Sequence, residues 1–354
     1  MTTILHAVIR LCNEARVGAT RGLWQRLKRA AQCFIQAKAS SVALGAMLAL
    51  FCVQATAQAW PSKPIHILVA AGAGSSPDIF ARVLSERLTR SLGQPVVVEA
   101  RPGGNGSIAA RYVAAAAPDG YTLLFSGNSA LIVNPLMTTD LPYKEEDLVP
   151  VAPVCFVPLA VAVPSTSSVK SIQQLLTQAK QSEIFFATPG AASLSRLIGE
   201  SFNERSGTKL RNIPYPTSGP AQTDVIGGRV PVLIDGLGGI VPHANSGRLR
   251  LLAVSTPTRF PDLPDVPSIS EAIPGLSVPG INSLMAPKGT PDNILNLLNR
   301  KVNEILKDPA VAKRFLSMGG EAAPGSRADL AETYRQQRVD FKRLIESANI
   351  HAEK

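Results

Sequence analysis

The sequence predicts an α/β protein whose sheets are mainly parallel. Short runs of β-branched and other apolar residues alternate with segments that repeat apolar residues at helical spacing. Loops rich in Gly, Ser and Thr separate many of these segments. The chain has 354 residues, and at roughly 100 to 200 residues per domain this length predicts about two compact lobes. The composition, 45% apolar and 18% charged, excludes a disordered or collagen-like chain.

The first elements predict a strand, a helix and a parallel strand. Residues 65–70 form a short β-branched run, residues 78–92 repeat apolar residues at helical spacing, and residues 95–99 form a second apolar run. Ser76 or Asp78 is expected to cap the helix at its start, because short polar side chains accept hydrogen bonds from unpaired N–H groups there. Gly93 is expected to close the helix in the left-handed conformation.

The same alternation continues through the chain. After a turn cluster at residues 101–106, we expect helices at residues 107–117, 169–182, 193–206 and 220–226, and strands at residues 121–126, 159–163, 184–188, 230–235 and 250–255. A proline-rich connection follows at residues 257–279. Thr290 is predicted to cap a helix that ends at Lys307, and Ser326 to open a last helix that ends near Ser347.

The positive charge is concentrated at the start of the chain. Residues 1–57 hold seven Lys or Arg residues and one acid, Glu14, which gives +6 of the total +10 and leaves +4 for the rest. An apolar run at residues 42–53 and small residues up to Ala57 and Ala59 complete the pattern of a secretory signal peptide, cleaved after one of these two alanines. An amphipathic anchor is the alternative. The apolar run is shorter than the ~20 residues of a membrane span. The remaining charge is modest, so nucleic acid is not expected as a partner.

Cofactor and metal signatures are absent from the pattern. Cys155 is the one cysteine beyond the predicted leader, and the four histidines have no partner at metal-ligand spacing. The loop at residues 72–77 lies where a dinucleotide fingerprint would, but Pro77 occupies the position of its third glycine. Ser167 and Lys170 have the spacing of a catalytic pair but fall at a predicted helix start. We therefore expect no cofactor, no metal and no catalytic residue.

Five loops of Gly, Ser and Thr end at predicted helix starts. They lie at residues 72–78, 103–107, 126–130, 188–195 and 217–221. Helix starts present unpaired N–H groups and a partial positive charge, which hold carboxylates or phosphates. In an open α/β sheet such loops meet at the carboxyl ends of the strands. One such loop is an ordinary connection between a strand and a helix, whereas five together predict an anion-binding cleft.

Motifs in the chain resemble the substrate-binding proteins of tripartite tricarboxylate transporters, the Bug family. The resemblance covers about residues 60–350 in collinear order. Its motifs lie at residues 60–65 (Trp-Pro-Ser-Lys-Pro-Ile), 92–99 (Leu-Gly-Gln-Pro-Val-Val-Val-Glu), 101–103 (Arg-Pro-Gly), 117–124 (Ala-Pro-Asp-Gly-Tyr-Thr-Leu-Leu), 134–135 (Asn-Pro), 213–215 (Ile-Pro-Tyr), 223–228 (Thr-Asp-Val-Ile-Gly-Gly), 247–250 (Gly-Arg-Leu-Arg), 263–267 (Leu-Pro-Asp-Val-Pro) and 286–291 (Ala-Pro-Lys-Gly-Thr-Pro).

The resemblance implies a two-lobed, type II-like periplasmic binding protein with a ligand cleft between the lobes. Residues 60–158 and 282–354 would form one lobe and residues 159–281 the other. Such a protein is monomeric, lies in the periplasm, catalyses no reaction, and delivers a small carboxylate or amino acid to membrane permease subunits. The alternative is an exported sensor or enzyme that kept the fold without transport.

In this family two loops grip the ligand carboxylate. Carried onto matching positions, the resemblance gives twelve ligand-binding candidates: Ala71, Gly74, Ser75, Ser76, Asp78, Ser129, Thr188, Gly190, Ala192, Ser193, Arg196 and Asp235. Asp78 would fix the first loop. Asp235 would receive a ligand amine or tie down the hinge. Arg196, where the family more often has His, would clamp a second carboxylate or face outward.

The first loop departs from the family pattern. The family often reads Pro-Phe-Pro-Pro-Gly-Gly-Ser there, whereas residues 70–76 lack the prolines and the aromatic residue. A less rigid loop costs more ordering entropy on binding, which predicts weaker affinity or a bulkier ligand. Pro216 and Thr217 replace the usual Lys-Gly pair, which removes one cation and one flexible position.

Overall fold

The computed structural model describes residues 28, 29, 31, 60–348 and 350. The chain divides into two units, Met1–Ala59 and Trp60–Lys354, and the fold is that of the second unit. The predicted leader and its cleavage sites fall almost entirely outside the described residues and stay predictions. Within the described ranges, none of the helices combines the length and the apolar character that a membrane span requires.

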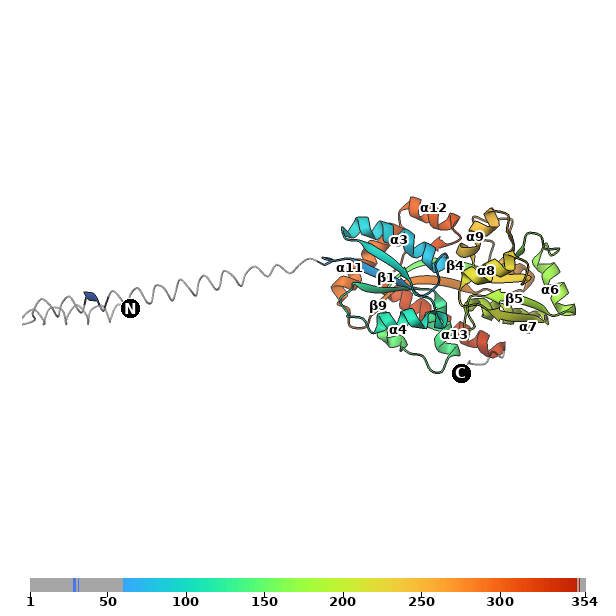
Figure 1. The fold of residues 1–354 in the computed structure, drawn as a ribbon, viewed down its shortest axis with the longest axis horizontal. Helices are drawn as coiled ribbons and strands as arrows, with labels where there is room; N and C mark the ends of the chain where they lie inside the picture. The colour runs from blue at the N-terminus through green and yellow to red at the C-terminus, as the bar shows by residue number, and fades with distance from the viewer. Residues whose placement is uncertain (1–27, 30, 32–59, 349, 351–354) are drawn as a thin grey trace, which may run out of the picture. The chain divides into compact units, whose positions relative to one another are not determined.

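The strands form a mixed sheet that runs through both halves of the unit (Figure 1). Its order is β2 (Val96–Ala100), β1 (Ile65–Val69), β3 (Thr122–Ser126), β9 (Pro279–Pro287), β4 (Leu148–Pro164), β7 (Val232–Gly236), β5 (Ile184–Thr188) and β6 (Leu210–Pro214). β8 (Leu249–Val254) and β10 (Glu321–Ala322) both pair with β4. β1 is parallel to β2 and β3, and β5 is parallel to β6 and β7. The predicted α/β class with parallel strands is confirmed.

Strand β4 connects the two halves. Its residues 148–158 pair antiparallel with β9, and its residues 159–164 pair antiparallel with β7 and β8. We call β1, β2, β3 and β9 with their helices the first half, and β5, β6, β7 and β8 with theirs the second half. Only residues 159–163 of this strand were predicted, because prolines at 150, 153 and 158 cannot donate to a ladder and argue against a central strand. The ladder accommodates them with register shifts near Pro150 and Pro153.

Helices cover the sheet in both halves (Figure 1). The longer ones are α3 (Ser76–Leu92), α4 (Ser107–Ala114), α6 (Ile172–Gln181), α7 (Leu194–Ser206), α8 (Ser218–Ile226), α9 (Leu237–Asn245), α11 (Asp292–Leu306), α12 (Pro309–Ser317) and α13 (Arg327–Ser347). Short turns of helix are α5 (Asn134–Met137), α10 (Ile269–Ala272), η1 (Gly104–Gly106), η2 (Ser129–Val133) and η3 (Glu145–Asp147).

Two predicted helix starts are wrong. The residue before α3 is Ser75 rather than Ser76 or Asp78, and its hydroxyl donates to the carbonyl of Gly72 at 2.6 Å instead of accepting from the helix. The residue before α11 is Pro291, while the Thr290 hydroxyl donates to the carbonyl of Pro287 at 2.8 Å. At the other end of α3, Gly93 has a φ of 69°, which confirms the predicted left-handed close.

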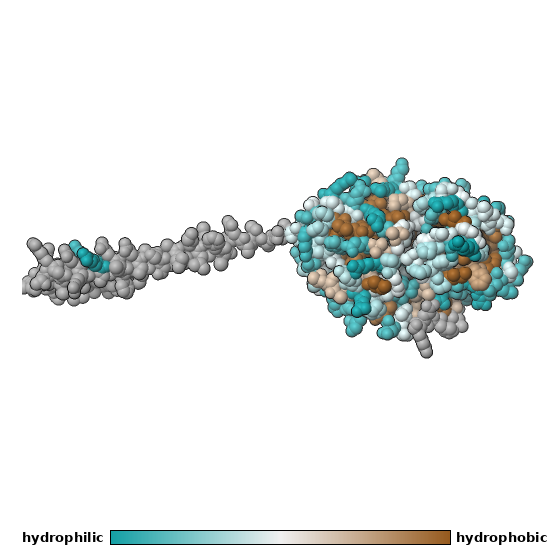
Figure 2. Space-filling view, viewed as in Figure 1, coloured by the Kyte–Doolittle hydropathy of each residue, from teal (hydrophilic) through white to brown (hydrophobic). Residues whose placement is uncertain are grey.

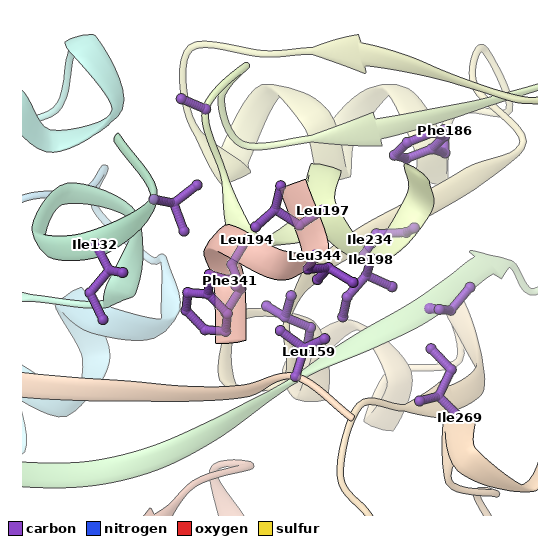
Figure 3. Packing of buried hydrophobic residues seen from close by; sticks show 14 of the residues in the cluster. Ile132, Leu159, Phe186, Leu194, Leu197, Ile198, Ile234, Ile269, Phe341 and Leu344 are labelled. Carbon is purple, nitrogen blue, oxygen red and sulfur yellow. The ribbon is translucent and has the colours of Figure 1, made fainter. Parts of the chain in front are cut away.

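The last helix, α13, joins the two halves through apolar packing. Figure 3 shows Phe341 and Leu344 of this helix beside Leu194 and Ile198 of α7, close to Leu159 of β4. All five side chains are buried in one apolar cluster. The C-terminal segment of the chain therefore packs against the second half after crossing from the first.

The start of α13 confirms the predicted cap at Ser326. The Ser326 hydroxyl accepts from the N–H of Asp329 at 3.0 Å, and the Asp329 carboxylate accepts from the N–H of Ser326 at 2.8 Å. We expect Ser326→Ala to lower the free energy of unfolding by about 1 kcal/mol, because two helix N–H groups depend on this reciprocal pair. Urea unfolding measures the loss. Ser317→Ala, which removes only a bond to the Arg314 carbonyl, is the control, and equal losses in both variants would contradict the role of the cap.

Candidate functional site

A cleft of about 140 Å³ lies where the loops of both halves meet. All five loops noted in the sequence contribute to it, through residues within 70–77, 102–106, 126–130, 189–195 and 216–218. Each follows a strand, and those after β1, β5 and β6 lead into α3, α7 and α8. The surface between the halves is pale in Figure 2, as expected for Gly, Ala, Ser, Thr and Pro, which make up most of the lining.

The loop before α3 is held by internal hydrogen bonds. The N–H of Gly74 donates to the Asp78 carboxylate at 2.9 Å, and the Ser75 hydroxyl donates to the carbonyl of Gly72. Arg82, one turn further on, makes two hydrogen bonds to the same carboxylate, at 3.0 and 2.9 Å. Asp78 is almost fully buried but does not line the cleft. The Asp78 carboxylate therefore interacts with groups of α3 and of the loop before it.

Ser76 lies in the first turn of α3 and lines the cleft. Its residue is 6% exposed, and its hydroxyl oxygen is buried without a hydrogen-bond partner among the described residues. Buried polar groups are nearly always paired, so an unpaired one calls for an explanation. The hydroxyl stands beside the unpaired N–H groups of a helix start, which attract negative charge. A bound anion would satisfy both.

The polar groups of the loop before α7 are mainly hydrogen-bonded to neighbouring parts of the protein. Ser193 caps the helix by accepting from the N–H of Arg196 at 3.2 Å, and Thr188 donates to the Asn212 side chain at 2.8 Å. Gly190 has a φ of 115°, a conformation that favours glycine. The Arg196 guanidinium donates to the carbonyl of Ala191 at 3.1 Å and lies 3.8 Å from the Glu200 carboxylate.

The predicted site residues fall into two groups. The cleft is lined by Ala71, Ser75, Ser76, Ser129, Ser193 and Asp235. The other candidates do not line it: Gly74, Asp78, Thr188, Gly190, Ala192 and Arg196. The second group belongs to the same loops, so these residues can shape the lining without forming it.

Sequence reasoning predicted the loop after β3 but missed Asn128 within it, and it missed the wall formed by β4 and β9. Asn128 lines the cleft; its side-chain oxygen accepts from the N–H of Ile281 at 2.6 Å and its amide donates to Gln337 of α13 at 2.5 Å. Asn282 of β9 also lines the cleft. Both are amides beside apolar runs, and only the pairing of β9 between β3 and β4 brings them here. No local sequence signal could have found Asn282.

Asp235, at the end of β7, is the one charged side chain among the described residues that line the cleft. It is 5% exposed. The N–H of Gly236 donates to its Oδ1 at 2.7 Å, and the Gln222 amide donates to its Oδ2 at 3.1 Å. Burial raises the pKa of Asp235 to about 6, although hydrogen bonds from Gly236, Ser218 and Gln222 act in the opposite direction.

The arrangement suits reversible binding better than chemistry. The described residues hold no cluster of three His, Cys, Asp or Glu side chains that could bind a metal ion. The lining offers hydroxyls, side-chain amides and helix starts, which are groups that hold a ligand through hydrogen bonds. Two α/β halves that meet at such a cleft, joined by long strands, are the architecture of periplasmic binding proteins.

Comparisons with known proteins agree with this class. Residues 80–350 match the family model described as tripartite tricarboxylate transporter family receptor. A UPF0065 protein of Bordetella bronchiseptica is 64% identical over 305 residues, which cover 86% of this chain and 91% of that protein. The protein BugT of Bordetella pertussis is 40% identical over 269 residues, 75% of this chain and 82% of that protein. The chain belongs to the tripartite tricarboxylate transporter receptor family, as its motifs predicted.

Solved structures share the fold. A protein of R. palustris solved with adipate has a TM-score of 0.81 and 30% identity, covering 82% of this chain and 99% of that one. The periplasmic binding protein BugD has a TM-score of 0.78 and 28% identity, covering 83% and 100%. MatC of Rhodopseudomonas palustris, with bound malate, has a TM-score of 0.74 and 25% identity, covering 81% and 100%. The predicted two-lobed periplasmic-binding-protein fold is confirmed.

Proposed function

We propose that the chain is a periplasmic receptor that captures a small carboxylic acid in the cleft and delivers it, chemically unchanged, to a membrane permease. The buried, unpaired hydroxyl of Ser76 at the start of α3 carries the proposal, because it is a vacant donor at a place that attracts negative charge. The loop before α7 approaches from the second half and supplies a second helix start.

The size of the cleft supports a small ligand. A volume of about 140 Å³ is close to the ~150 Å³ of an engineered cavity that accommodates benzene. Dicarboxylic acids of similar size are bound in two relatives, as adipate and malate. We infer that this chain takes an acid of the same class.

We assign the two lobes that close on the ligand to residues 60–158 with 282–354, and to residues 159–281. The change of partners within β4 supports this division, since residues 148–158 pair with β9 and residues 159–164 with β7 and β8. A hinge at this point would let the halves open and close without breaking either parallel core.

A panel of malate, adipate, citrate, benzoate and glutamate tests the function. A bound acid stabilises the folded receptor by RT ln(1 + [L]/Kd), about 2.7 kcal/mol at one hundred times Kd, which thermal unfolding detects. Mass spectrometry of the released ligand should recover the acid unchanged. Conversion of the acid into a product would instead identify an enzyme, and a panel without any binder would remove the proposal.

We expect Ser76→Ala to weaken acid binding by about 10 to 100-fold, because a hydrogen bond to a charged group contributes about 1.5 to 3 kcal/mol. Folding should be unaffected, since this hydroxyl has no partner among the described residues. Isothermal titration calorimetry measures the affinity. Ser85→Ala, on the same helix but away from the cleft, is the control, and its affinity should equal that of the wild type.

Asp78→Ala should weaken binding by about tenfold, because it releases the N–H of Gly74 and removes the acceptor that orders the first loop. Glu86→Ala, which removes exposed ion pairs with Arg90 on the same helix and Arg314 on α12, is its control. Unchanged affinity in both Ser76→Ala and Asp78→Ala would contradict the assignment of the first loop to ligand binding.

A further inference from the structure

The cleft places an acidic side chain, Asp235, beside a proposed ligand that is itself an acid. Among the described residues that line it, Asp235 carries the one ionisable charge, and no Lys, Arg or His is present to offset it. Hydroxyls and helix starts can accommodate one negative charge. Two carboxylates that share a desolvated site cannot both stay ionised without a large cost, and one of them retains a proton.

The back of Asp235 is filled by donors. Gly236 and Gln222 each donate to one carboxylate oxygen. The orientation of the Gln222 amide is fixed from behind, because its oxygen faces Nε2 of His243 at 3.1 Å and must accept from that nitrogen. The His243 N–H therefore points to the Gln222 oxygen, which turns the Gln222 amide group toward Asp235 and the carbonyl of Gly239. The Asp235 carboxylate also lines the cleft, where a ligand can meet it.

No other charge among the described residues neutralises this carboxylate. Burial, and to a lesser degree Arg248, lower the pKa of His243, which disfavours the charged form of its imidazole. Across the sheet β4 places Ala160 opposite Asp235, and α8 contributes Ser218 and Gln222. From the first half, α3 brings the uncharged Ser76, while the Asp78 carboxylate one turn away is paired with Arg82.

We propose that the cleft captures its carboxylate together with one proton, which lies between Asp235 and a ligand oxygen. The inference rests on the proposed function and deepens it. The proton comes from water, no covalent bond changes, and the neutral carboxyl of Asp235 becomes a donor to the ligand. The preferred ligands are then acids that need no ammonium group to balance Asp235.

The shared proton between Asp235 and the ligand determines how the binding affinity changes with pH. The pKa of Asp235 is about 6 in the free protein, and a bound negative charge raises that pKa further. When the pH is below the pKa of Asp235 in the free protein, the carboxyl already carries the proton and the affinity for the acid is at its maximum. Between the free and the bound values each binding event takes up one proton, so the affinity falls about tenfold per pH unit as pH rises.

Calorimetry in buffers of different ionisation enthalpy tests the inference with whichever of malate, adipate, citrate, benzoate or glutamate binds. For the wild type we expect uptake of about one proton per ligand near pH 7, and a Kd that rises about tenfold between roughly pH 6.5 and 7.5. Asp235→Asn should still bind the acid, with no proton uptake and a flat pH profile. Asp224→Asn, whose carboxylate pairs with Arg229 on the outer side of α8, is the matched control and should behave as the wild type.

The outcomes separate this inference from the proposed function. Acid binding by the wild type without proton uptake overturns the inference alone, and it needs no variant to fold. Loss of acid binding at every pH in Asp235→Asn also overturns it, because an amide at this position should still accommodate the ligand. Binding of glutamate alone overturns it as well, because Asp235 would then pair with the ligand ammonium group. Failure of all five acids to bind removes the proposed function, and the inference with it.

Discussion

Phe80→Ala is expected to lower the free energy of unfolding by about 3 to 5 kcal/mol. Phe80 lies on the inner face of α3 and is 0% exposed. Its ring packs against Phe315 of α12 with centroids 5.0 Å apart. A Cβ built on Gly320 or Gly238 would come within 3 Å of the ring, so backbone surrounds it closely. When the ring is removed, the surrounding backbone cannot move in to fill the space, and a cavity remains.

Urea unfolding followed by circular dichroism measures this loss. The control is Phe185→Ala, which removes a ring that is 45% exposed on β5 and should cost far less. Equal losses for the two variants would show that α3 is not anchored through Phe80. Because Phe80 lies one turn after Ser76, the same variant should also weaken acid binding.

Gly72→Ala is expected to weaken acid binding at least tenfold while leaving the free energy of unfolding nearly unchanged. Gly72 belongs to the loop before α3, and a Cβ there would lie 2.9 Å from Cβ and 3.0 Å from Cγ2 of Thr217, before α8 in the second half. Carbon atoms in contact prefer about 3.5 to 4.0 Å. The added methyl therefore opposes the close approach of the two halves, and about 1.4 kcal/mol against the closed state reduces affinity tenfold.

A second substitution should restore the affinity. Thr217→Gly in the Gly72→Ala background removes the opposing side chain, and Thr217 accepts no helix N–H bond that would be lost. Gly219→Ala is the matched control, because a Cβ there meets nothing within 4 Å. Calorimetric titration with the acid compares the four proteins. Unrestored affinity in the double variant would show that Gly72→Ala acts through its own loop rather than through Thr217.

The parts of the fold that could be predicted are those with a local signal. β1, α3 and β2 follow from apolar periodicity, and Gly93 and Ser326 mark helix ends correctly. Among the missed elements, α12 had a local signal in Asp308 and Pro309, whereas α9 and β6 carry contrary signals that tertiary structure overrides. α9 contains Pro242 and has two glycines in its first turn, and β6 (Leu210–Pro214) is short and polar in its middle. Burial of residues 237–241 decides α9, and parallel pairing with β5 decides β6. Neither contribution can be read from a single segment.

The candidate site also contains parts that could be predicted from a local signal and parts that could not. The loops before α3 and α7 can be recognised in the sequence by small hydroxylated residues ahead of a helix, and both loops line the cleft. Asn282 and Gly280 enter only because β9 pairs with β4 in one register, where Val157 lies opposite Gly280. A resemblance to a family could supply Asp235. That it is the only charged side chain among the described residues of the lining required the structure.

The order of strands also dictates when the chain can finish folding. β3 ends at Ser126, yet its neighbour in the sheet is β9, which begins at Pro279. A polypeptide that emerges from its N-terminus thus exposes an unsatisfied strand edge until most of its length has been synthesised. Such distant pairing is slow to form. The nascent chain therefore completes its sheet later than the formation of its local helices would suggest.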